Sequence, residues 1–173
     1  MLKKIIVNAL IILFLVTLIF SNYIKIIEVN GVIPDFILIL TILNGFFLSP
    51  IFAMIFGFFS GLAIDISYYP LLGFYALIYT IIGYTTSISR IIYINNSLIS
   101  SILIFIFFIL KSLLFLILGF FFLELEYIAA FFRPSKFFVE LIYTLIISIP
   151  FFLIYRNIYS KSRKNKINVW YWV

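Results

Sequence analysis

Long apolar runs separated by short polar segments constrain this chain more than any other feature of its sequence. Hydrophobic residues make up 66% of the 173 residues, and charged residues make up only 10%. A soluble globular domain needs more polar surface than this composition supplies, whereas a membrane protein can expose apolar side chains to lipid. The sequence therefore predicts an all-α integral membrane protein whose residues 1–173 form a single membrane domain.

Six apolar runs approach the length of a membrane-spanning helix, which is about 20 residues with some tolerance. They cover residues 5–20, 34–48, 51–66, 71–87, 98–123 and 137–155. No cleavage site follows the first run, so we expect it to remain as an uncleaved helix. Pro34 can begin the second helix, because the N–H group that proline lacks has no helical partner in a first turn. The expected architecture is a polytopic six-helix transmembrane bundle, in which the short second and third runs could form a re-entrant hairpin.

Basic residues indicate the orientation, because Lys and Arg are enriched on the cytoplasmic side of membrane proteins. With the N-terminus inside, the cytoplasmic segments hold Lys3, Lys4, Arg90, Arg156, Lys161, Arg163, Lys164 and Lys166. The outer segments then hold only Lys25, Arg133 and Lys136. We therefore expect both the N-terminus and the C-terminus to be cytoplasmic.

This orientation places the acidic residues at or near the outer side. They are Glu28, Asp35, Asp65, Glu124, Glu126 and Glu140. Acidic residues contribute little to topology, so the orientation rule does not itself require this distribution. They could be ordinary interfacial residues paired with nearby basic side chains, or an acidic outer rim that meets a partner or a cationic ligand.

Small residues form stripes on the third and fourth predicted helices. On the third helix, four residues spaced four apart share one face: Ala53, Gly57, Gly61 and Asp65. On the fourth helix, the stripe consists of Gly73, Ala76, Thr80, Gly83 and Ser87. Small faces permit close backbone approach in lipid, where the hydrophobic effect does not drive helices together. We expect these helices to pack on each other or on a neighbour.

Asp65 and Lys111 are charged residues inside apolar runs, and a charge costs about 2.5–3.5 kcal/mol at mid-membrane depth on insertion scales but less near an interface. Asp65 ends the small face of its helix, where it could cap or bound the following turn or hold a partner. Lys111 lies deep within the fifth run, so we expect it to face the bundle and to pair with Asp65, Asp35, Glu140 or free carbonyl groups. The alternative is a shifted or tilted helix that brings Lys111 nearer to an interface.

The sequence contains no Cys and no His, which excludes disulfides, thiol nucleophiles and the usual zinc ligands. No phosphate loop, metal-ligand spacing or pair of nucleophile and base appears. Asp35 and Asp65 could form an intramembrane carboxylate pair like that of aspartyl membrane proteases, but the flanking motifs of those enzymes are missing. We therefore expect no enzyme activity and no cofactor.

The C-terminal tail, residues 156–173, combines five basic residues with Trp170, Tyr171 and Trp172. Basic clusters beside a membrane attract anionic lipids, and amphipathic aromatic rings favour the headgroup region. The tail is predicted to anchor to anionic lipids on the cytoplasmic surface. Nothing in the chain forms a nucleic-acid-binding fold, so we expect no nucleic-acid partner.

Four short segments in residues 33–87 together resemble a known family. They are "PDF", "GFFSGLAID", "PLLGFYAL" and "GY", and the matching positions are Pro34, Asp35, Gly57, Gly61, Leu62, Asp65, Gly73, Gly83 and Tyr84. Their order and spacing resemble the rod shape-determining protein MreD family of small polytopic proteins of the bacterial inner membrane. The fifth and sixth predicted spans carry no residues that match.

The resemblance implies a non-enzymatic scaffold of the cell-elongation machinery, which maintains rod shape and organises peptidoglycan synthesis. Its implied partner is an MreC-like bitopic membrane protein, which would link it to MreB-like filaments and to a RodA-type glycosyltransferase with its penicillin-binding partner. In that setting, the matching residues would serve helix packing or partner binding, and the outer acidic rim with Asp35 and Asp65 would orient the partner's transmembrane or juxtamembrane segment.

A second reading is a transporter component. The family is also similar to the six-helix substrate-binding subunits of energy-coupling-factor transporters, so the chain could be a small-molecule-binding membrane component of such a transporter. A site between helices of a bundle is physically reasonable. The bundle interior is expected to contain few polar groups apart from Lys111 and scattered Ser, Thr and Asn, which disfavours this reading.

Overall fold

The computed structural model describes residues 28–29, 31–68, 71–88, 97–123, 128 and 133–163. Five α-helices lie in this part of the chain: α3 (Phe36–Phe47), α4 (Pro50–Tyr68), α5 (Phe74–Ile88), α6 (Ser97–Phe122) and α8 (Pro134–Arg163). Each coincides with one of the apolar runs after the first. The predicted first helix, residues 5–20, lies outside the described residues.

Three of the described helices contain stretches long and apolar enough to cross a membrane. They are Pro50–Ser67 of α4, Ile99–Phe122 of α6 and Pro134–Ile158 of α8. The 12 residues of α3 extend only about 18 Å at 1.5 Å per residue, against a hydrocarbon core of about 30 Å. The structure thus defines an all-helical, multi-pass membrane protein, while six full spans remain a prediction.

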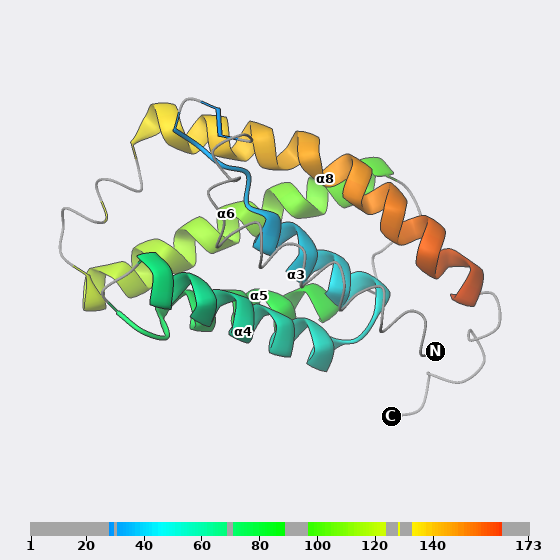
Figure 1. The fold of residues 1–173 in the computed structure, drawn as a ribbon, viewed down its shortest axis with the longest axis horizontal. Coiled ribbons are helices and arrows are strands. Elements are labelled where there is room, and N and C mark those ends of the chain that lie inside the picture. The colour runs from blue at the N-terminus through cyan, green and yellow to red at the C-terminus, as the bar shows by residue number, and fades with distance from the viewer. Residues whose placement is uncertain are drawn as a thin grey trace.

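The short helix α3 is the centre of the molecule. Its residues from Ile37 to Phe46 are all buried, and it contacts α4, α5, α6 and α8. In Figure 1, α8 runs along the top of the view and the α4–α5 pair along the bottom, with α3 between them. A helix that is apolar on every side is expected to be surrounded by protein or lipid. Here the surrounding groups are four other helices.

Side-chain caps set where α3 and α4 begin. Asp35 is the N-cap of α3 and accepts a hydrogen bond from the backbone N–H of Leu38 at 2.8 Å. Pro34 therefore precedes the cap, and the expectation that it lies in the first turn is wrong by two residues. Ser49 accepts a hydrogen bond from the N–H of Phe52 at 3.2 Å, and Pro50 is the first residue of α4.

The small faces of α4 and α5 lie against each other. A Cβ atom added to Gly61 would lie 2.5 Å from Cα of Ala76, and one added to Gly83 would lie 2.7 Å from the carbonyl carbon of Ala53. A Cβ atom on Gly57 would lie 2.8 Å from the carbonyl carbon of Tyr79. Real Cβ atoms do not approach backbone this closely, so these contacts depend on the absence of a side chain.

The boundaries of two other helices differ from those that hydropathy predicts. Helix α5 begins at Phe74, three residues after the apolar run starts. Helix α8 begins at Pro134, three residues before its apolar run, and continues to Arg163, beyond the end of that run. Hydropathy marks only the apolar part of a helix, and α8 continues past it into the basic segment.

Large apolar side chains project outward from the bundle. On α8 they form a ridge along one face: Phe138, Ile142, Ile146, Ile149 and Leu153. On α6 the exposed set includes Ile102, Phe105, Ile106, Leu113 and Ile117. Such extensive apolar exposure is unfavourable in water but normal where the surroundings are lipid.

We predict that Gly61→Val destabilises the protein by about 1–3 kcal/mol or more, because the new side chain would collide with the backbone of α5. Phe59→Val is the matched control, since it places the same side chain on the exposed side of α4. Thermal unfolding in mild detergent measures both midpoints. Equal midpoints for the two variants would contradict the close approach of α4 and α5.

Candidate functional site

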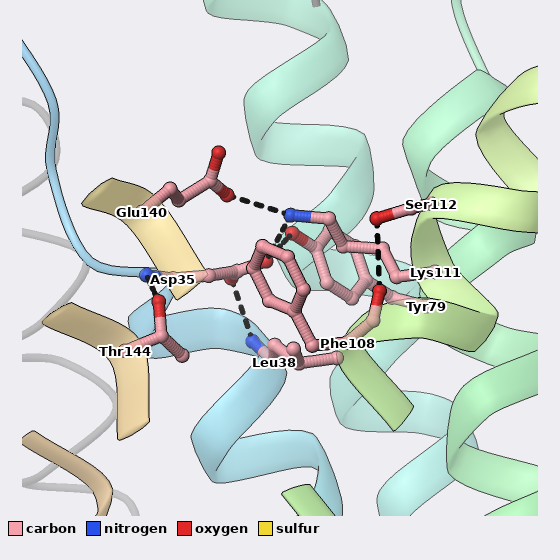
Figure 2. Close-up of polar contacts among 8 residues, drawn as sticks. All are labelled: Asp35, Leu38, Tyr79, Phe108, Lys111, Ser112, Glu140 and Thr144. Carbon is pink, nitrogen blue, oxygen red and sulfur yellow. Dashed lines mark hydrogen bonds and ion pairs between the residues drawn. The ribbon is translucent and has the colours of Figure 1, made fainter. Parts of the chain in front are cut away.

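Lys111 lies near the middle of α6 and is the positive centre of a buried polar cluster. Its Nζ atom donates to Oδ2 of Asp35 at 2.8 Å and to Oε1 of Glu140 at 2.8 Å. The side chains of Lys111 and Asp35 are 3% and 7% exposed, whereas that of Glu140 is 23% exposed. Figure 2 shows the two carboxylates converging on the ammonium group from different helices.

An aromatic ring completes the surroundings of the ammonium group. The Nζ atom of Lys111 lies 4.9 Å from the ring centroid of Phe108, which is on the preceding turn of α6. A cation within about 6 Å of a ring face is attracted by the ring's quadrupole, and more strongly where water is excluded. Phe108 thus supports the positive charge without adding a further negative one.

Asp35 takes part in more hydrogen bonds than Glu140, the other acidic residue of the cluster. Its Oδ1 atom caps α3 by accepting from the N–H of Leu38, and its Oδ2 atom accepts from the hydroxyl of Tyr79 at 2.8 Å as well as from Lys111. The backbone N–H of Asp35 donates to Oγ1 of Thr144 at 3.0 Å. One residue therefore ties the start of α3 to α5, α6 and α8.

The arrangement satisfies the physical requirements of charge burial. An unpaired ion in a low-dielectric interior is strongly unfavourable, but a pair with additional hydrogen bonds offsets much of that cost. The ammonium group of Lys111 contacts two carboxylates and one aromatic ring, and the carboxylate of Asp35 accepts hydrogen bonds from three donors. The cluster is thus a polar junction of four helices, in which removal of one member leaves other charged groups unsatisfied.

Asp65 lies elsewhere, at the corner between α4 and α5, and is fully buried. Its carboxylate accepts from three backbone N–H groups: those of Gly73 at 3.0 Å, Tyr75 at 2.9 Å and Ala76 at 3.1 Å. These N–H groups have no partners within a helix that begins at Phe74, so the carboxylate satisfies them. Gly73 has φ of +94°, a conformation that favours glycine.

The structure separates the predicted site residues into three places. Pro34 and Asp35 lie at the Lys111 cluster; Asp65 and Gly73 form the α4–α5 corner. The glycines at the α4–α5 contact are Gly57, Gly61 and Gly83. Tyr84 is 54% exposed on α5. Of the partners left open for Lys111, the structure pairs it with Asp35 and Glu140, while Asp65 is engaged by backbone N–H groups.

Sequence reasoning missed Tyr79 and Thr144. Tyr79 is one of 12 tyrosines and follows no motif, and Thr144 lies in an apolar run with no polar neighbour to mark it. Both are buried and both bind Asp35. The only available signal was the general rule that a buried hydroxyl seeks a partner, and it does not say which hydroxyls are buried.

Among the described residues, no group of three or more His, Cys, Asp or Glu side chains could hold a metal ion. The ion pairs of Lys111 and the hydrogen bonds of Asp35 and Asp65 given above join the protein's own helices.

The fold and the site together define a multi-pass membrane protein whose helices are joined by glycine contacts and a buried ion-pair cluster. A comparison with known families matches residues 2–160 to the rod shape-determining protein MreD. The chain therefore belongs to the MreD family, which confirms the resemblance seen in residues 33–87 and implies a role in rod shape determination. Members of this family are generally not enzymes. Neither curated proteins nor solved structures gave a match.

We predict that Lys111→Met destabilises the protein far more than Tyr79→Phe does. Removing the ammonium group leaves two carboxylates facing each other in the bundle, and loss of one member of a buried pair costs about 3–5 kcal/mol. Tyr79→Phe removes one hydrogen bond and leaves Lys111 on Asp35, which costs about 0.5–1.5 kcal/mol. The measurement is the free energy of unfolding of each variant in mixed detergent micelles. Equal losses of stability in the two variants would contradict the central role of Lys111.

Proposed function

We propose that this protein is a non-enzymatic scaffold of the bacterial inner membrane that binds an MreC-like bitopic partner in the cell-elongation machinery. The observation that carries the proposal is membership of the MreD family over residues 2–160. Through the partner, the protein would connect to MreB-like filaments and to a RodA-type glycosyltransferase with its penicillin-binding partner. Its task is to hold these components together, so it requires no turnover.

The packing of the helices supports a scaffold. Helices α4 and α5 approach each other at Gly57, Gly61 and Gly83, and Asp65 fixes the corner between them. Contacts at backbone distance leave little room for sliding, so this pair would present a rigid surface to a partner. Asp35 and Asp65 are buried, and they would orient the partner by fixing the shape of this surface rather than by direct contact.

The orientation forms part of the proposal. Both termini would be cytoplasmic, as the distribution of Lys and Arg predicts. Glu140 would then lie toward the outer end of α8, on the side where a bitopic partner carries its extracytoplasmic domain. The basic and aromatic C-terminal segment would contact anionic lipids on the cytoplasmic surface.

We expect an MreC-like bitopic protein to be recovered when the tagged protein is purified from native membranes in mild detergent. The measurement is mass spectrometry of the co-purifying chains, with an unrelated tagged multi-pass protein expressed to the same level as the control.

Depletion of the protein should convert rod-shaped cells into rounded ones, because the scaffold would no longer position wall synthesis.

Two results would contradict this proposal. Recovery of ATPase subunits without an MreC-like chain would favour a transporter component. Recovery of the same chains from the control protein would show that the association is not specific to this scaffold.

A further inference from the structure

Helix α8 contains a proline in its interior, Pro150. Proline has no backbone N–H, so the carbonyl group of Ile146 lacks the donor that an α-helix ordinarily supplies from four residues later. The proline ring also crowds that carbonyl group, and sharp bends in helices occur mainly at prolines and a few similar features. Position 150 is therefore the point at which α8 can change direction most easily.

The part of α8 after Pro150 is fixed by two large buried side chains. Phe152 and Tyr155 are each 1% exposed. Their ring centroids both lie 5.9 Å from that of Phe47, which ends α3, and the hydroxyl of Tyr155 donates to Oδ1 of Asn44 at 3.2 Å. Aromatic side chains bury a large apolar area. This part of α8 is thus held on α3 by packing.

The part of α8 before Pro150 makes two polar contacts with the bundle. Oε1 of Glu140 accepts from Nζ of Lys111 on α6 at 2.8 Å. Oγ1 of Thr144 accepts from the backbone N–H of Asp35 at 3.0 Å. Figure 2 shows both side chains leaving α8 toward the Lys111 cluster.

The apolar contacts of this first part involve fewer large buried side chains. The structure describes all of residues 134–149, and Leu141 is their only buried hydrophobic residue. Phe137 is partly buried and packs on Phe108 of α6, with ring centroids 5.5 Å apart. The polar contacts therefore carry a larger share of the cohesion here than they do after the proline.

The ion pair between Glu140 and Lys111 can open without leaving a buried charge unpaired. The side chain of Glu140 is 23% exposed, so water can replace the ammonium group as its partner. Lys111 is buried, but it also donates to Oδ2 of Asp35 at 2.8 Å and would keep that carboxylate. Breaking a buried pair is most costly when it leaves an uncompensated charge, and this pair avoids that outcome.

We propose that α8 is hinged at Pro150 and that residues 134–149 form a movable arm. The ion pair between Glu140 and Lys111 latches this arm to the bundle, in the position that the structure shows. When the latch opens, the arm turns about the proline while packing on α3 keeps the rest of α8 in place. The inference goes beyond the proposed scaffold, because it gives one helix two positions. A partner that binds one position more tightly would shift the population toward it.

The test measures distances between two spin labels by pulsed electron paramagnetic resonance, on the full-length protein in lipid nanodiscs. The chain has no Cys, so two introduced cysteines are the only labelling sites. The arm pair combines Ile106→Cys on α6 with Ile142→Cys, and the reference pair combines Ile106→Cys with Ile154→Cys beyond the hinge. All three positions are exposed. Residue 142 lies about 12 Å from the hinge along the helix, so a turn of about 20° moves it by about 4 Å.

We expect Glu140→Gln to add a second distance to the arm pair, longer by about 4 Å or more. Glutamine keeps the size of the side chain and removes the charge that holds Lys111. The reference pair should keep its single distance. Thr144→Val removes the other polar contact of the arm and should act in the same direction, so the test does not depend on one variant.

Two further variants locate the hinge. Pro150→Ala, added to Glu140→Gln, should remove the longer distance, because alanine supplies the N–H that the carbonyl group of Ile146 lacks. Tyr155→Phe is the matched control, since it removes a hydrogen bond of α8 beyond the hinge. It should leave the arm pair unchanged.

Three results would overturn the hinged arm. The first is an arm pair whose distance is unchanged in both Glu140→Gln and Thr144→Val. The second is an equal change in the arm pair and the reference pair, which would mean that all of α8 shifts or that the fold is lost. The third is a longer distance that persists after Pro150→Ala is added.

Discussion

The ammonium group of Lys111 in the interior of an apolar bundle is the constraint on which the rest of the structure depends. A charge at that position requires counter-charges from other helices, and Asp35 and Glu140 supply them at 2.8 Å each. Because Asp35 is also the N-cap of α3, the same contact fixes where the central helix begins. Helix α3 is too short to cross a hydrocarbon core by itself, and its start is anchored inside the protein.

The helices are held together in two different ways. Helices α4 and α5 are held by shape, since glycines allow their backbones to touch. Helix α8 packs buried aromatic side chains against α3 and α6. It also makes polar contacts at separate points, from Glu140 to Lys111, from Thr144 to the backbone of Asp35, and from Tyr155 to Asn44.

The sequence predicted the parts of this structure that depend on local composition. The five described helices coincide with apolar runs because hydropathy is a local property, and the small faces were visible from residue spacing. The central place of α3 was not predictable, because a helix surrounded by protein and one facing lipid have the same apolar composition. Capping was one of the roles that the sequence left open for Asp65, and Asp35 and Glu140 were among the candidate partners of Lys111. The choice between these alternatives depends on which helix ends meet in space. Tyr79 could not be distinguished from the other tyrosines for the same reason.

The most direct test is a double-mutant cycle between Asp35→Asn and Lys111→Met, measured as unfolding free energies in mixed micelles. If the ion pair anchors α3, the double variant will be more stable than the sum of the two single losses predicts, with a coupling energy of about 0.5–3 kcal/mol. Losses that add to within about 0.5 kcal/mol would contradict the account, because independent sites behave in that way.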